Sequence, residues 1–153
     1  QLDRFLMHIR LHLPGLEAER QILDLVESEN NATEAAPPVL SLETLRGARR
    51  DVAGVHLSAA LRDYIVRLVV ATRAPPFSDE IAHAVSPRGS LALAAAARAR
   101  AYLLGRDHAL PEDVESVAAD ALAHRMVLSW AATAEGRTAR GIVADILSRT
   151  DPL

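Results

Sequence analysis

The chain carries helix-starting residues at intervals along most of its length, and these constrain its fold more than any other feature. Ser41, Ser58 and Thr138 each precede an apolar periodic stretch, where a hydroxyl can accept a hydrogen bond from the first helical turn. Ser86 is followed by a proline, and Pro111 is followed by two acidic residues, both typical of a first turn. The pattern predicts a mainly α-helical bundle.

The expected helices cover most of the chain after residue 40. We expect them over 41–52, 59–73, 86–104, 111–125 and 138–149, with a brief extended stretch at 127–128. The helix over 86–104 is rich in alanine and apolar almost all round, which predicts that it forms the buried centre of the bundle. Gly105 ends this helix.

The first residues follow another pattern. From Phe5 to Leu13 alternate positions are apolar, whereas His8, Arg10 and His12 fall on the other face. This period of two predicts one N-terminal strand. Because a lone strand cannot satisfy its own edges, we expect it to be the last strand of a sheet whose other strands lie upstream. A helix is expected over 16–29, and 30–38 is polar and contains proline, as linkers do.

Composition excludes several classes of function. The net charge of −3 provides no basic field, so nucleic-acid binding is not expected. The absence of cysteine excludes disulfides, thiolate zinc sites and thiol catalysis. No apolar run approaches the roughly 20 residues that span a membrane. The start of the chain lacks a signal peptide, so we expect a cytoplasmic protein without a membrane span. It also lacks an initial methionine, which leads us to expect a fragment, although tag removal would give the same start.

The basic residues are informative in kind. All 17 are arginine, and the chain contains no lysine. Because a P-loop uses a lysine to reach the terminal phosphates of a nucleotide, the chain holds no standard P-loop. Any nucleotide chemistry of this chain is therefore expected to be auxiliary.

Arg88 is the most suggestive single residue. It lies in the first turn of the helix over 86–104, where the helix dipole disfavours a cation by about 0.3–1 kcal/mol. The free N–H groups of that turn attract phosphate, and an arginine adds bidentate donors to the same anion. The alternative interpretation is an exposed arginine whose stem covers apolar surface. Arg4 by itself has the pattern of an ordinary surface arginine, paired with Asp3.

Other candidate sites have simpler explanations. His8 and His12 share one strand face, but four residues of strand span about 13 Å, too far for one metal ion. The serines mostly precede helices, which capping explains better than nucleophilic catalysis. Phe77 and Trp130 are predicted to be packing anchors, and a partner surface is the alternative for Trp130.

Several short motifs occur in a fixed order. They are Gln1–Met7, Asp63–Arg73 with its final Thr-Arg pair, Ser86–Leu91, Gly105–Asp107, Pro111–Val114 and His124-Arg125. Taken together, their order and spacing resemble the MoxR branch of AAA+ ATPases over nearly the whole chain. The departures are Ala84-Val85, where the family often has Gly-Ala, a longer loop from Ala74 to Val85, and Leu110, where the family usually has Thr or Asp.

The resemblance implies a division of the chain. Residues 1–29 would be the last strand and helix of the α/β ATPase core, 30–38 a linker, and 39–153 the helical lid. A helix inserted before the sensor-2 position would lie near 41–52. The implied fold is thus mainly α, a lid bundle with one N-terminal strand left over from the core.

The resemblance also implies roles for two arginines. Arg4 matches the arginine finger, which acts in trans on the γ-phosphate bound by a neighbouring subunit. Arg88 matches the sensor-2 arginine, which couples the nucleotide to the lid in cis or in trans. ATP and Mg²⁺ would be bound by the full-length protein, whose P-loop lies upstream, so this segment alone is expected to be inactive.

The implied activity is that of a whole ATPase. The parent protein would hydrolyse ATP in a hexameric ring of identical subunits and remodel or mature a client protein. Its partners would be the upstream core, neighbouring subunits and a protein with a von Willebrand factor A domain. The alternative, from another class, is a non-catalytic helical adaptor or regulatory module that binds a partner without nucleotide chemistry.

Overall fold

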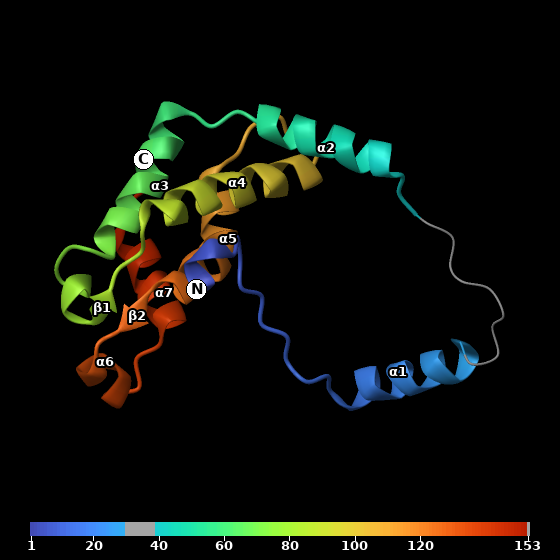
Figure 1. The fold of residues 1–153 in the computed structure, drawn as a ribbon, viewed down its shortest axis with the longest axis horizontal. Coiled ribbons are helices and arrows are strands. Elements are labelled where there is room, and N and C mark those ends of the chain that lie inside the picture. The colour runs from blue at the N-terminus through green and yellow to red at the C-terminus, as the bar shows by residue number, and fades with distance from the viewer. Residues whose placement is uncertain (30–38, 153) are drawn as a thin grey trace. The chain divides into compact units, whose positions relative to one another are not determined.

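The computed structural model describes residues 1–29 and 39–152, and these are mainly helical (Figure 1). The chain divides into two compact units. The larger unit contains Gln1–His8 and Ala48–Leu153, and the smaller unit contains Ile9–Gly47. The linker predicted at 30–38 lies outside the described residues. The division into ATPase core and lid stays a prediction.

Four helices form the body of the larger unit. They are α3 (Ala59–Ala71), α4 (Pro87–Leu103), α5 (Pro111–Leu122) and α7 (Ala139–Arg149). Helix α4 packs between α3 and α5, and α5 also contacts α7. The predicted helix starts at Ser58, Ser86 and Thr138 are confirmed, because each hydroxyl accepts a hydrogen bond from a backbone N–H of the first turn. The predicted α-helical bundle is therefore confirmed.

Short elements complete this unit. Strands β1 (Ile81–His83) and β2 (Val127–Leu128) pair antiparallel, so the extended stretch predicted at 127–128 is confirmed. Turns of 3-10 helix lie at η1 (Leu2–Arg4), η2 (Phe77–Asp79) and η3 (Ala123–Arg125), and a short helix α6 spans Trp130–Ala134. Of these, η1 and η3 contact each other, which places the start of the chain beside the end of α5.

Helix α4 is buried on one face only. Its buried residues are small or aliphatic: Gly89, Ala92, Leu93, Ala96, Ala97 and Ala101. On the other face Leu91 is 71% exposed and Leu103 is 81% exposed. Helix α4 therefore packs between α3 and α5, in agreement with its predicted central place in the bundle, but it is not buried on every side. The small side chains of the buried face allow α3 and α5 to approach closely, whereas Leu91 and Leu103 lie on a face that stays exposed.

The smaller unit contains α1 (Leu16–Glu29) and the beginning of α2 (Leu42–Gly54), which continues into the larger unit. Both helices agree with the sequence prediction, and Ser41 Oγ accepts a hydrogen bond from Thr44 N at 3.0 Å. The apolar residues of α1 are largely exposed, as at Leu16 and Leu23. Within the described residues this unit therefore has no core of its own.

The predicted N-terminal strand is not formed. Residues 5–13 contain no strand, and most of their side chains are exposed. The physical reason is that a strand needs a partner, and no strand in the described ranges pairs with this segment. Instead, its backbone is bonded to the bundle at single points, as where His8 N donates to Asp120 O at 2.9 Å.

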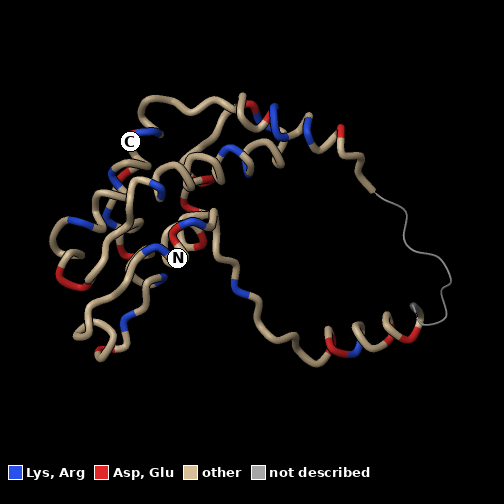
Figure 2. Tube along the Cα trace, viewed as in Figure 1, with Lys and Arg blue, Asp and Glu red and all other residues tan. Residues whose placement is uncertain are grey.

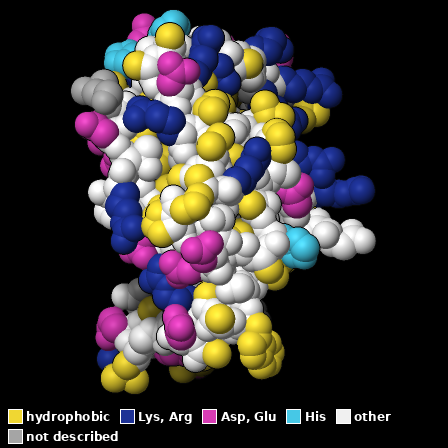
Figure 3. All heavy atoms as spheres, turned by 90° about the vertical axis from the view of Figure 1, so that its left-hand side faces the viewer, with side chains coloured by type: hydrophobic (Ala, Val, Ile, Leu, Met, Phe, Trp, Pro, Cys, Tyr) yellow, Lys and Arg dark blue, Asp and Glu magenta, His cyan; other side chains and the backbone are white. Residues whose placement is uncertain are grey.

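The two predicted packing anchors differ in outcome. Phe77 is buried, as expected, with 5% of its surface exposed. Trp130 is 89% exposed, so its prediction as a packing anchor is wrong. Trp130 is the first residue of the short helix α6, whose buried residue is Ala132. Figure 3 shows exposed hydrophobic side chains among charged ones of both signs on the face that it draws.

Charged residues of both signs are interspersed along the larger unit (Figure 2). None of the described helices is long and apolar enough to cross a membrane.

Candidate functional site

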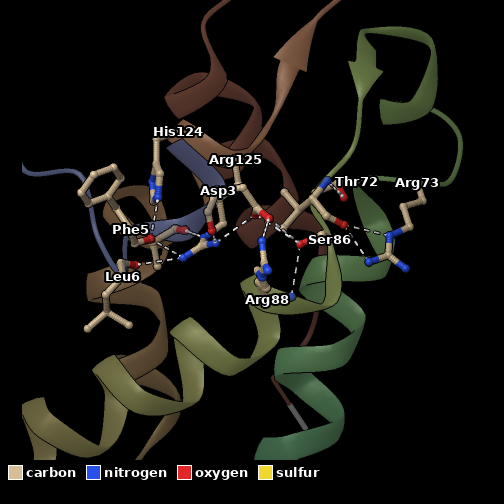
Figure 4. A network of polar contacts seen from close by, with 11 residues as sticks. Asp3, Phe5, Leu6, Thr72, Arg73, Ser86, Arg88, His124 and Arg125 are labelled. Atoms are coloured by element: carbon tan, nitrogen blue, oxygen red, sulfur yellow. Dashed lines mark hydrogen bonds and ion pairs between the residues drawn. The ribbon is translucent and has the colours of Figure 1, made fainter. Parts of the chain in front are cut away.

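The segment before α4 is fixed at one residue, Val85, by two side chains from the end of α3. The Thr72 hydroxyl donates to Val69 O at 2.7 Å and accepts from Val85 N at 3.3 Å. Arg73 donates to Val85 O through Nε at 3.0 Å and Nη2 at 2.7 Å. The Thr-Arg pair noted in the sequence therefore holds both backbone groups of Val85, directly before the first turn of α4 (Figure 4).

The first turn of α4 meets the start of the chain. Ser86 Oγ donates to the Asp3 carboxylate, lying 3.1 Å from Oδ2 and 3.2 Å from Oδ1. The Arg88 guanidinium lies beside the same carboxylate, with Nη1 3.3 Å from Oδ2. Arg88 remains largely exposed, so this contact leaves most of its donors free for another anion.

Asp3 is the acidic residue that these contacts share. Burial raises the pKa of its carboxyl group, but hydrogen bonds from Arg125, Ser86 and Arg88 outweigh burial and hold the pKa below its usual value. Asp3 is therefore ionised at neutral pH. The expected pairing of Asp3 with Arg4 is wrong, because Asp3 pairs with Arg88 and Arg125, which come from elements far along the chain.

Arg4, the other arginine singled out in the sequence, is a surface residue. It ends η1 and is exposed, and its guanidinium makes no hydrogen bond or ion pair with the residues that the structure describes. Arg4 lines an open cavity of about 460 Å³ together with Arg88 and Arg125. The remaining lining residues are Asp3, Leu6, Leu91 and Ala92. Three arginines against one carboxylate give this arginine cavity a net positive charge, which suits an anion such as phosphate.

Sequence reasoning did not single out Arg125 as a site residue, although His124-Arg125 is one of the motifs that resemble the family. The structure buries its side chain to 3% exposure and turns it toward the first residues of the chain. Its partners among those first residues lie about 120 positions away in sequence. No local pattern could reveal such a contact.

The Gly-Arg-Asp motif after α4 has a structural role. Arg106 forms two parallel hydrogen bonds with the buried Asp113, at 2.7 Å and 2.6 Å. Asp113 Oδ2 also accepts from Leu110 N at 2.8 Å. Leu110 has no side chain that could cap α5, but its own backbone N–H is satisfied by the Asp113 carboxylate from the first turn of that helix. In the described part of the chain, no group of three His, Asp or Glu residues is arranged to hold a metal ion.

Comparison with known proteins identifies the bundle. The AAA lid domain family model matches residues 65–146. The Uncharacterized protein YeaC of Bacillus subtilis is 38% identical over 97% of this chain and 45% of its own length. Chaperone MoxR1 of Mycobacterium tuberculosis is 38% identical over 88% of this chain and 37% of its own length.

A solved structure agrees with these matches. The crystal structure of a "putative ATPase" from Cytophaga hutchinsonii superposes with a TM-score of 0.92 and 33% identity. The match covers 98% of this chain and 47% of that protein. The chain thus spans less than half the length of the relatives that it matches, and it resembles MoxR proteins over most of its own length.

Proposed function

The chain belongs to the AAA lid domain family, and from this premise we propose that it is the lid segment of a MoxR-like AAA+ ATPase that remodels or matures a client protein. The observation that carries this proposal is the arginine cavity. Arg4 and Arg88, the two residues that match the family's arginine finger and sensor 2, line the same positively charged space.

In this proposal the two arginines stabilise the charge of a transferring phosphoryl group. That charge spreads over the phosphoryl oxygens in the transition state, and fixed cationic donors lower its energy. The unpaired guanidinium of Arg4 is free to take this position. Arg88 makes a single 3.3 Å contact with Asp3, which a more highly charged phosphate would replace.

ATP and Mg²⁺ would be held mainly by an upstream core that supplies the P-loop. The arginine cavity fits this division of labour, because its donors suit phosphate oxygens, whereas its lining contains only one carboxylate for a metal ion. Bound ATP would supply the phosphoryl group, and the residues of this chain would orient and stabilise it.

Because Arg4 and Arg88 line one cavity, we infer that both act on the same nucleotide. If Arg4 acts on the nucleotide of a neighbouring subunit, Arg88 faces the same nucleotide and acts in trans as well. The assembly would be a ring of identical subunits, a hexamer in the family pattern, working in the cytoplasm with a partner that bears a von Willebrand factor A domain. Residues 1–29 would belong to the core and 39–153 to the lid, with 41–52 as the inserted helix.

The test is ATP turnover by the complete protein with Arg4→Ala or Arg88→Ala. We expect Arg4→Ala to lower kcat by about 10³-fold or more, the range measured for arginine fingers. Arg62→Ala, on an exposed position of α3, is the matched control and should retain normal turnover. Near-normal turnover in both cavity variants would remove the proposed roles, and it is the result that a non-catalytic adaptor predicts.

Subunit mixing tests the action in trans. Each arginine variant is mixed with a variant that lacks the P-loop lysine of the core, both being inactive alone. If Arg4 and Arg88 act on the neighbour's nucleotide, each mixture regains turnover, because an intact nucleotide site meets an intact arginine across the interface. No recovery with Arg88→Ala would show that Arg88 acts within its own subunit.

A further inference from the structure

Arg125 uses all three guanidinium nitrogens in hydrogen bonds. Nε donates to Ala121 O at 2.7 Å, which ties the side chain to its own helix end. Nη1 donates to the backbone oxygen of Asp3 and lies 3.0 Å from its Oδ1. Nη2 donates to Phe5 O at 2.5 Å and to Leu6 O at 3.3 Å. A buried charge is costly without such partners, and only Asp3 compensates it with a full negative charge.

These contacts are made by the two residues next to Arg4 in the chain and do not involve the Arg4 side chain. The backbone carbonyls of the residue before it and the residue after it both accept from the Arg125 guanidinium. His124 Nε2 also lies 3.1 Å from Phe5 O, so the same carbonyl has a second hydrogen-bond partner (Figure 4). The backbone at Arg4 is therefore fixed on both sides, while its guanidinium stays free at the cavity.

Asp3 extends the same network to α4. Its carboxylate accepts from Arg125 and also from Ser86 and Arg88 at the first turn of that helix. One acidic side chain thus joins the segment that carries Arg4 to the helix that carries Arg88. A planar guanidinium can serve acceptors in several fixed directions at once, which an ammonium group does not do as well.

We propose that Arg125 is a positioning residue for Arg4: it fixes the first turn of the chain to the bundle, so that Arg4 and Arg88 are presented together at one cavity. This inference rests on the proposed function for the use of Arg4, but the ordering of the segment can be measured without it. It predicts that weakening the Arg125 contacts disorders residues 2–6 while the helical bundle stays folded.

The first experiment measures this ordering in the 153-residue chain. The chain has no cysteine, so Leu2→Cys and Leu103→Cys, both at exposed positions, can carry a pair of nitroxide labels. We expect one narrow distance distribution in the parent and a broad one with Arg125→Lys. Arg137→Lys is the matched control, because Arg137 pairs with Glu80 and Asp145, none of which lines the arginine cavity, and the distribution should stay narrow.

A second variant, Asp3→Asn, provides the test if Arg125→Lys does not fold. Asp3→Asn leaves Arg125 in place and removes the charge that joins it to α4, so it should broaden the same distribution with unchanged helical circular dichroism. If the distribution stays narrow in a folded Arg125→Lys chain, or in Asp3→Asn when Arg125→Lys does not fold, the inference is overturned.

The second experiment uses turnover by the complete ATPase. Arg125→Lys should lower kcat by up to about 10²-fold, as expected for a misplaced catalytic group, and leave KM for ATP unchanged. In the Arg4→Ala background it should cause no further loss, because Arg125 acts through Arg4. A further loss in the double variant would overturn the positioning role and leave the proposed function intact. Normal turnover of Arg4→Ala would instead refute the proposed function, and the label distances alone would then decide whether Arg125 orders the segment.

Discussion

Gly89 leaves room for Val85. A Cβ atom added at Gly89 would lie 2.3 Å from Cγ1 of Val85 and 3.1 Å from Cδ2 of Leu122. Val85 is 1% exposed and β-branched, so its methyl group cannot move aside easily. The valine before Ser86, one of the departures from the family pattern, is therefore accommodated by a glycine one helical turn later.

Gly89→Ala is expected to destabilise the fold by about 1–3 kcal/mol, the usual cost of overpacking. This exceeds the gain of about 1 kcal/mol that alanine brings to a helix. Val85→Ala should suppress the cost, because it removes the clashing methyl groups. Urea unfolding of the wild type, both single variants and the double variant gives the coupling free energy. Additive effects would show that the two residues do not share this space.

Thr72→Val should cost about 1–3 kcal/mol, because it leaves a buried backbone N–H of Val85 without its acceptor. The substitution keeps the shape of the side chain, so packing changes little. The measurements are urea unfolding and hydrogen exchange at the Val85 amide, which should become faster. Thr133→Val is the control, since the Thr133 hydroxyl bonds a carbonyl at an exposed position of α6. An unchanged exchange rate at Val85 would contradict the assigned bond.

The helices could be predicted because their signals are local. Ser58, Ser86 and Thr138 act within one turn of their own position, and each hydroxyl makes the bond that its place in sequence predicts. The strand prediction failed for the opposite reason. Alternation of apolar residues from Phe5 to Leu13 describes a face, but a strand also needs a partner, which these described residues do not contain.

The candidate site could be predicted only in part. Arg4 and Arg88 were selected by resemblance to a family, and the structure brings both to one cavity. Asp3 and Arg125, which link them, carry no local signal, because their contacts join residues 122 positions apart. The prediction that Trp130 is a packing anchor was wrong because it rested on the usual burial of aromatic residues, whereas Trp130 lies exposed on a short helix.

Trp130→Ala should change the free energy of unfolding by less than about 0.5 kcal/mol, as is usual at an exposed position without special contacts. Because this is the chain's single tryptophan, its fluorescence reports one site. Its emission maximum should match that of tryptophan in water and shift little on unfolding in urea. Phe77→Ala is the contrast, with an expected loss of about 3–5 kcal/mol at a buried site. A blue-shifted emission in the native chain would show that Trp130 is covered.

We expect the free energy of unfolding of the bundle to depend on pH through Asp113. Burial raises the pKa of the Asp113 carboxyl group. Hydrogen bonds from Arg106 and Leu110, together with the charges of Arg106 and Arg100, lower the pKa by more than burial raises it, so it lies below the ordinary 3.8. The unfolded chain binds this proton more readily than the folded chain. The stabilisation is therefore complete above pH values near 4 and is lost as the pH falls through the lowered pKa.

Asp113→Asn removes that ionisable group. Removal of one partner from a buried ion pair costs about 3–5 kcal/mol, and the partly exposed Arg106 favours the lower end for this variant at neutral pH. Urea unfolding at a series of pH values should show wild type and variant converging below pH 4, because protonation abolishes the pair in the wild type. Asp63→Asn, at an exposed position of α3, should stay within about 0.5 kcal/mol of wild type throughout. A constant difference between wild type and Asp113→Asn down to pH 2 would mean that packing of the carboxyl group, rather than its charge, holds α5 to the loop after α4.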